Sequence, residues 1–264
     1  MGTHQLLDPL PILGVFVAFA VFSLLCYEVG FRFGRWWQDR EPGEQEGPTG
    51  LLVGSILALL AFLLAVTMGM ASDRFDARRG IVLDEANSIG TTYLRAGYLP
   101  EPASSEIREL IREYVPLRIV VTDVNAVQLG ADIKRSQEIL SELWAISEQV
   151  AKTTDQGDLV SLYLDSLNET IDLNETRITA GLFARVPETI LLLLVGGSAL
   201  SLAMVGYSAG LTKRRGFLNA FVLIIALGAV LMIVVDLDRP RDGFIQVSQQ
   251  PLIDPQRQIG PPSP

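Results

Sequence analysis

The sequence predicts an all-α fold: a four-span transmembrane helical protein with a helical soluble domain inserted between spans two and three. Four apolar stretches, at about residues 9–30, 51–71, 186–209 and 216–235, each approach the roughly 20 residues that a helix needs to cross a bilayer. The long polar segment between the second and third stretches has apolar residues at helical spacing and no alternating strand pattern. We therefore expect a first transmembrane hairpin over 1–71, an acidic helical domain over 72–185, a second hairpin over 186–235 and a polar, Pro-rich tail over 236–264.

The first span is predicted to be a retained transmembrane helix rather than a signal peptide. No basic residue precedes it, and no small-residue cleavage site follows it. Glu28 lies at its far end, where an interfacial carboxylate reaches water. Tryptophans at the headgroup level and arginines just beyond are typical of a membrane interface, and the residues after this span are Arg32, Arg35, Trp36, Trp37 and Arg40.

The second span continues into a charged segment without a Pro or a turn cluster, so residues 51–95 are predicted to form one helix. At about 1.5 Å per residue, these 45 residues extend roughly 67 Å, more than twice the hydrocarbon thickness. Gly50, Gly54 and Gly69 are small residues that permit close contact with a neighbouring helix.

The polar domain is predicted to hold four helices. Phe75, Val82, Ala86, Ile89 and Tyr93 mark the buried face of the first, which Pro100 and Pro102 end. The second is expected to begin at Ser104 or Ser105, to carry Ile107, Ile111, Tyr114, Val121 and Val124 on one face and to kink at Pro116.

The third helix is predicted from about Ala131 to Ala151. The fourth has a repeat of apolar residues at threes and fours, with Asn174 at a core position. Packing between helices of one chain explains this Asn better than a coiled-coil seam, because the repeat is shorter than three heptads.

The second hairpin begins with Pro187 and Glu188, which suit a helix N-terminus. Gly206 and Gly210 match the small-residue motif for close packing of membrane helices. Lys213, Arg214 and Arg215 form a basic turn. The Pro-rich composition predicts that the last dozen residues are disordered.

Composition excludes several function classes. The net charge is −9, and residues 72–185 hold 19 acidic and 12 basic residues, which argues against nucleic acid and anionic lipid as partners. With Cys26 and His4 as the only Cys and His, zinc, haem and Cys-His or Ser-His catalysis are not expected, and neither is a cofactor. Asp84 with Glu85, or Asp236 with Asp238, would suit a divalent cation, but no nucleophile or base accompanies them, so we predict neither an enzyme nor a metal site.

The middle of every span lacks Asp, Glu, Lys, Arg and His. Transporters, pumps and voltage sensors usually need ionisable groups there, so those functions are disfavoured. A pore assembled from several subunits and a membrane scaffold both remain compatible.

We expect a multi-pass protein of the plasma membrane with both termini on the side of the 72–185 domain. The two short loops carry Arg32, Arg35 and Arg40, and Lys213, Arg214 and Arg215, which favours a cytoplasmic location for the loops and an outside location for the domain. Arginines at the opposite span ends weaken this preference, and they are Arg74, Arg78, Arg79, Arg177, Arg185, Arg239 and Arg241.

The junction after the second span is the main candidate site, and its residues are Asp73, Arg74, Asp76, Arg78, Arg79, Glu85 and Asn87. Asp76 is placed to pair with Arg79 at i,i+3. One hypothesis is a salt-bridged collar at the membrane exit that contacts lipid phosphates. The other is a ring of guanidiniums at the mouth of an oligomeric pore, attracting anions.

Two motifs resemble the bestrophin-like domain family of bacterial and plant membrane proteins. They are DRFDARRGIVLDEANSIGTTYLRAGYLPEP followed by IRELIREYVPLRI, and DLDRPRDGFIQVSQQPL after the fourth span. The second motif supplies the candidates Asp236, Asp238, Arg239, Pro240 and Gly243. The family is distantly similar to bestrophins, which are pentameric anion channels with four spans per subunit and a cytosolic helical domain. The resemblance covers residues 50–252, but this chain lacks the acidic calcium-binding cluster, and the outside location above differs from a cytosolic domain.

The resemblance implies a homo-oligomeric ion channel, for anions, in which the second span lines the pore. The alternative is a non-conducting membrane scaffold or sensor whose acidic helical domain binds a protein partner. In both cases the lipid bilayer is a partner.

Overall fold

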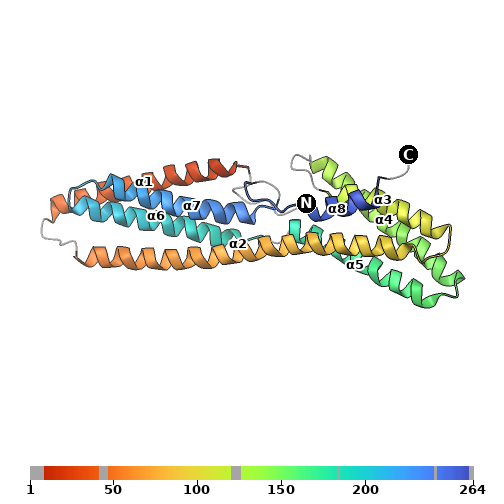
Figure 1. The fold of residues 1–264 in the computed structure, drawn as a ribbon. Coiled ribbons are helices and arrows are strands. Elements are labelled where there is room, and N and C mark those ends of the chain that lie inside the picture. The colour runs from red at the N-terminus through yellow and green to blue at the C-terminus, as the bar shows by residue number, and fades with distance from the viewer. Residues whose placement is uncertain (1–8, 42–46, 120–125, 183–184, 241–242, 262–264) are drawn as a thin grey trace. The chain divides into compact units, whose positions relative to one another are not determined.

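The computed structural model describes residues 9–41, 47–119, 126–182, 185–240 and 243–261, and all regular structure within these ranges is helical. Figure 1 shows the helices, which are α1 (Ile12–Arg40), α2 (Gly47–Ala96), α3 (Ala103–Arg118), α4 (Ala126–Thr153), α5 (Gly157–Leu182), α6 (Glu188–Leu211), α7 (Phe217–Asp238) and α8 (Gln250–Ile259). The chain divides into two compact units. The membrane unit holds the described residues up to Phe75 and those from Arg185 to Gln246, and the helical unit holds the rest.

The membrane unit confirms the four spans. Among the described residues, α1, α2, α6 and α7 are long and apolar enough to cross a membrane. α1 is longer than its apolar segment, since it continues ten residues past Gly30 to Arg40. No Pro interrupts residues 31–40, so the helical hydrogen bonds continue through this charged and aromatic end.

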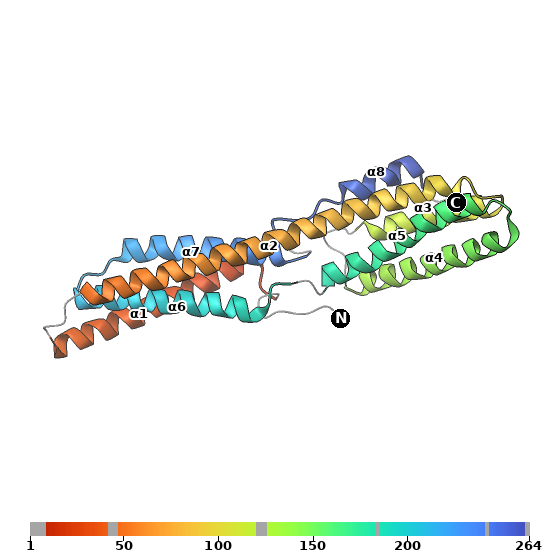
Figure 2. The same ribbon diagram turned by 90° about the horizontal axis from the view of Figure 1, so that it is seen from below.

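Glycines bring α1 and α6 into backbone contact, and Figures 1 and 2 show these helices side by side. A Cβ at Gly206 would lie 2.1 Å from the carbonyl oxygen of Tyr27, and one at Gly30 would meet the backbone of Ala203. The close packing predicted at Gly206 and Gly210 is therefore confirmed, and Gly34 completes the partner motif on α1. The glycines of α2 differ, because a Cβ at positions 50, 54 or 69 would meet no heavy atom of the described residues within 4 Å.

The apolar half of α2 reaches the core of the membrane unit through one narrow face. Leu60 and Leu64 are buried against α1, α6 and α7, where they join a cluster that contains Phe19, Leu194, Leu202, Ile224, Leu227 and Leu231. A second cluster lies at the other end of the spans and includes Ile12, Ala71, Val186, Leu191 and Val234.

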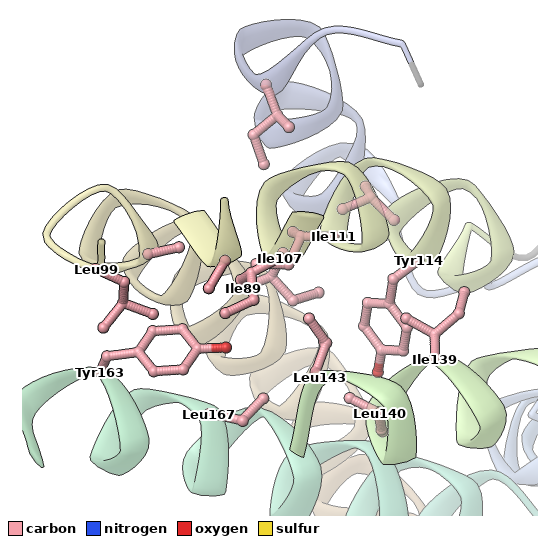
Figure 3. Close-up of a cluster of buried hydrophobic side chains, with 14 of the residues drawn as sticks. Ile89, Leu99, Ile107, Ile111, Tyr114, Ile139, Leu140, Leu143, Tyr163 and Leu167 are labelled. Carbon is pink, nitrogen blue, oxygen red and sulfur yellow. The ribbon is translucent and has the colours of Figure 1, made fainter. Parts of the chain in front are cut away.

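The helical unit packs the second half of α2 with α3, α4, α5 and α8 around one apolar core. Figure 3 shows α2, α3, α4 and α5 contributing to it, and its labelled side chains include Ile89, Ile107, Leu143 and Leu167. On the face predicted for the first helix, Val82, Ala86 and Ile89 are buried, whereas Phe75 and Tyr93 are only partly buried. On the face predicted for the second, Ile107, Ile111 and Tyr114 are buried. α3 begins at Ala103, just before the predicted Ser cap, and Pro116 lies in its last turn, with the helix ending at Arg118. Val121 and Val124 lie outside the described residues.

The tail contains a helix where disorder was predicted, so that prediction is wrong for residues 253–259. α8 carries Leu252 and Ile259 seven residues apart on one face, and both are buried in the core of the helical unit. Arg112 also donates from Nε to the carbonyl oxygen of Ile259 at 3.1 Å. Burial of this face orders a segment that composition alone marks as unstructured.

Candidate functional site

The candidate residues of the junction lie on two different sides of α2. One side is buried at intervals of three, four and seven residues, at Leu60, Leu64, Thr67, Ala71, Arg78, Val82, Glu85 and Ile89. The other side is exposed at similar intervals, at Leu52, Leu59, Phe62, Val66, Asp73, Asp76, Leu83, Asn87 and Leu94. Arg78 and Glu85 therefore face the interior, whereas Asp73, Asp76 and Asn87 face away from this chain.

Glu85 is the centre of a buried charge cluster in the helical unit. Its side chain is fully buried, and its carboxylate accepts hydrogen bonds from Nε of Arg118 at 2.6 Å and from Nη1 of Arg177 at 2.5 Å. α2, α3 and α5 each supply one member. Removing the Glu85 carboxylate would leave two guanidiniums without a counter-charge in a low-dielectric interior.

Neutral polar groups complete this cluster. The hydroxyl of Tyr114 lies 3.5 Å from Oε1 of Glu85 and donates to Oδ1 of Asn174 at 3.4 Å. Arg177 also donates from Nη2 to Oε1 of Gln249 at 2.8 Å, which connects the cluster to the segment before α8.

Burial shifts the pKa values of two members of the Glu85 cluster. It raises the pKa of the Tyr114 hydroxyl well above its ordinary value. It lowers the pKa of the Arg177 guanidinium, and the Glu85 charge partly opposes that effect.

Sequence reasoning found Glu85 and Asn174 but missed Arg118 and Arg177. The signal that could have found these two arginines is their position in the helical repeat of buried residues. Arg118 follows the buried Tyr114 by four residues, and Arg177 follows Asn174 by three, so both continue a core-facing side. Asn174 is buried within this chain, as packing between its own helices requires.

The exposed part of the junction is less constrained. The ion pair predicted between Asp76 and Arg79 is not formed: both residues are exposed, and neither has an ionic partner among the described residues. Arg74 is half-buried, and its Nη1 atom is buried without a hydrogen-bond partner in the part of the chain that the structure describes. Asp73 and Asn87 are exposed.

The second motif forms the end of α7 and the turn that follows. The carboxylate of Asp236 accepts the backbone N–H groups of Phe244 at 2.8 Å and Ile245 at 3.0 Å. Gly243 has a φ of 148°, and a Cβ there would lie 2.2 Å from Oδ1 of Asp236. Only glycine fits this turn.

The other members of that motif connect α7 to the rest of the membrane unit. Asp238 accepts the N–H of Val186 at 2.7 Å and Nε–H of Arg185 at 3.2 Å, just before α6. Arg239 donates to the carbonyl oxygen of Leu10 at 2.8 Å, and Pro240 follows it.

The paired acids considered as cation ligands are engaged separately. Glu85 binds two arginines while its neighbour Asp84 is exposed, and Asp236 and Asp238 bind different partners. Within the described ranges, no group of three or more His, Cys, Asp or Glu side chains is arranged to hold a metal ion.

Comparisons with known proteins identify the fold. A crystal structure of a bacterial bestrophin homologue from Klebsiella pneumoniae aligns with a TM-score of 0.62 at 13% identity, over 94% of this chain and 97% of that chain. A single-residue variant of that homologue aligns with a TM-score of 0.65 at 14% identity, over 97% and 96% of the two chains. Among curated proteins, none matches significantly. A family model described as the Bestrophin-like domain matches residues 16–252. Because this match spans most of the sequence, the chain belongs to the Bestrophin-like domain family.

Proposed function

We propose that the protein is the subunit of a homo-oligomeric ion channel in which α2 lines the pore. The chain is a multi-pass membrane protein related to bestrophin channels, which makes conduction the first function to consider. We place this channel in the plasma membrane. The basic residues of the two short loops favour a cytoplasmic location for these loops.

The exposure of α2 is the observation that carries this proposal. In its most apolar 18-residue window only 17% of residues are buried within the chain, against 28% in α1 and 33% in α6 and α7. Leu59 and Phe62 are each about 60% exposed on the side away from the other spans. In a ring of subunits, this side would face the central axis or a neighbouring subunit, since α1, α6 and α7 already cover the opposite side.

A pore lined by this side of α2 would have an apolar constriction followed by a charged mouth. Phe62 and Val66 would narrow it, and apolar constrictions of this kind gate by dewetting. Asp73 and Asp76 would lie where the helix leaves the hydrocarbon, and Asn87 about three turns further along the helix.

A non-conducting scaffold or sensor is the second candidate. The helical unit exposes large apolar side chains, including Val127, Trp144 and Leu162, which is the kind of surface that a protein partner covers. Cross-linking in membranes that recovers one stoichiometric partner, together with no current from the purified oligomer, would support this candidate.

Reconstitution of the purified full chain tests the channel. We expect an oligomer by mass photometry and unitary currents in planar bilayers. Phe62→Ala should change the unitary conductance, whereas Phe221→Ala on α7, where the side chain is equally exposed, should not. A monomeric protein, or an oligomer that passes no current in any salt gradient, would overturn the proposal.

A further inference from the structure

We propose that the last turns of α1 bind an anionic phospholipid of the surrounding membrane, and that Arg40 recognises its phosphate. The proposal concerns lipid recognition and does not depend on whether the protein conducts ions. The charge balance that argues against anionic lipid belongs to residues 72–185, whereas α1 lies in the membrane unit. The lipid-phosphate contact suggested by the sequence was placed elsewhere, at the junction after the second span.

One side of α1 is exposed and changes along its length from apolar to aromatic to cationic. Its exposed residues follow one another at intervals of three and four, and they are Leu25, Val29, Phe33, Trp36 and Arg40. From Leu25 to Arg40 the helix rises about 22 Å, and one leaflet with its headgroups is roughly 20–22 Å thick. A phospholipid beside this side of α1 therefore has its acyl chain on Leu25 and Val29 and its phosphate near Arg40.

Aromatic rings from two helices gather at the headgroup level. Phe33 stacks on Trp36 with 5.7 Å between ring centres and lies 5.8 Å from the ring of Tyr207 on α6, and Trp37 adjoins both rings of α1. The close approach of α1 and α6 brings Tyr207 there, since a Cβ at Gly34 would lie 2.2 Å from its carbonyl oxygen. Phe33 and Trp36 stay 52% and 45% exposed, so lipid can reach this aromatic cluster.

The aromatic cluster holds the guanidinium of Arg40. Its central carbon lies 4.0 Å from the centre of the Trp36 ring, a cation–π contact. Stacking occupies the face of the guanidinium and leaves its N–H edge free to donate to phosphate oxygens. Arg40 has no ion pair with another described residue, although the exposed Glu41 follows it. An unpaired and oriented guanidinium therefore lies at the depth of the lipid phosphates.

The other basic residues at this end of the spans are less suited to the role. Three of them already bind acids, in the pairs Arg32–Glu28, Arg215–Glu28 and Lys213–Asp39. Arg35 and Arg214 are exposed, but no ring contact with a described aromatic residue holds either one. Residues 28–46 and 213–215 together contain six basic and five acidic residues, so general attraction to an anionic membrane is weak. A preference for anionic lipid therefore depends on Arg40.

Quenching of tryptophan fluorescence by brominated lipids tests the proposal. The full chain with Trp144→Phe keeps Trp36 and Trp37 as its only tryptophans, and it is reconstituted in phosphatidylcholine vesicles. We expect brominated phosphatidylglycerol to associate about fivefold more strongly than brominated phosphatidylcholine, the factor expected for one arginine near an anionic membrane surface. The bromine atoms are on the acyl chains, so free phosphate cannot produce this signal.

Substitutions in the same background separate Arg40 from general charge. Arg40→Gln should reduce the ratio of the two association constants to about one. Arg214→Gln is the matched control, because that arginine is also exposed but lies outside the aromatic cluster, and the ratio should not change. Trp36→Leu should lower the ratio although Arg40 is retained, and Trp36→Phe should restore most of it. Both variants are read from Trp37.

The outcomes decide between a lipid site and an ordinary membrane interface. A ratio near one before any substitution at Arg40, or a ratio that Arg40→Gln leaves unchanged, would overturn the proposal. Equal losses for Arg40→Gln and Arg214→Gln would show general electrostatic attraction and would overturn it as well. Quenching by brominated phosphatidylcholine should be the same for all variants that keep both tryptophans, which shows that they are inserted and folded alike.

Discussion

Glu85 and Arg118 form a buried ion pair, with 2.6 Å between Oε1 and Nε, and side chains that are 0% and 6% exposed. Arg177 binds the second carboxylate oxygen, so one carboxylate pairs with two guanidiniums. The buried carboxylate of Glu85 therefore stabilises the fold of the helical unit and is not part of its surface.

Glu85→Gln is expected to destabilise the protein strongly. It keeps the shape of the side chain but leaves two buried guanidiniums without a counter-charge, and breaking a buried pair typically costs about 3–5 kcal/mol. The measurement is thermal or denaturant unfolding of the purified full chain in detergent. Glu138→Gln is the control, since this acid contacts Lys134 and Arg135 on the surface, where one pair contributes about 0–1 kcal/mol. Equal losses for the two variants would contradict the role assigned to Glu85.

Gly206→Ala is expected to force α1 and α6 apart. The added Cβ would lie 2.1 Å from the carbonyl oxygen of Tyr27, and backbone cannot yield as a flexible side chain can. Overpacking of this kind costs about 1–3 kcal/mol, so the melting temperature in detergent should fall by several degrees. Gly196→Ala on the same helix meets nothing within 4 Å and should be neutral or stabilising, because Ala is the better helix former. A melting temperature for Gly206→Ala at or above that of Gly196→Ala would show that the glycine contact is not needed.

Gly243→Ala is expected to open the turn after α7. The new Cβ would displace the Asp236 carboxylate, which accepts the N–H groups of Phe244 and Ile245, and a φ of 148° is unfavourable for Ala. We expect a loss of about 1–3 kcal/mol and faster proteolysis at this turn.

Asp236→Ala should have a similar effect. The double variant should lose less stability than the sum of the two single losses, because both changes remove the same interaction. Gly260→Ala provides the control. That residue also has a positive φ, 83°, but has open space around it, so only backbone strain is added. Strict additivity of the Gly243 and Asp236 changes would argue against their shared role.

The spans could be predicted from the sequence because about 20 apolar residues leave few alternatives to a membrane helix. The charged residues of α2 could not be placed as easily. A Glu and an Arg on a polar helix both suggest an outward side, and only the structure reveals that Glu85 pairs with arginines of α3 and α5 and that Arg78 is buried. The partner glycines on α1 were missed for a different reason, since Gly30 is the last residue of the apolar run and Gly34 lies beyond it. α8 was missed because two buried residues, Leu252 and Ile259, order a segment rich in Pro and Gln.

High pH is expected to destabilise the helical unit through Tyr163. Burial raises the pKa of this hydroxyl from its ordinary value of 10.0 to about 12, and Ser147 donates a hydrogen bond to it. A group whose pKa is higher in the folded state contributes stability that is complete below its unfolded pKa and is lost as the pH rises. The free energy of unfolding should therefore fall between pH 10 and 12, by up to about 1.4 kcal/mol per pH unit for this group. The free energy of unfolding of Tyr163→Phe should fall less over the same range than that of the unsubstituted protein, when both are measured by denaturant unfolding. Parallel curves would exclude Tyr163 as a source of the alkaline loss.

The sidedness predicted from the loops can be tested with one cysteine at a time. In a Cys26→Ala background, Asp165→Cys places a thiol on the exposed surface of α5, and Arg214→Cys places one on the exposed turn between α6 and α7. Basic residues of the short loops favour the cytoplasm, although two of them are partly neutralised, since Lys213 pairs with Asp39 and Arg215 with Glu28. We therefore expect a membrane-impermeant maleimide to label position 165 in intact cells and to label position 214 only after the cells are lysed. The opposite pattern would place the helical unit in the cytoplasm, as the resemblance to bestrophins implies, and would show that the arginines at the other ends of the spans outweigh the loops.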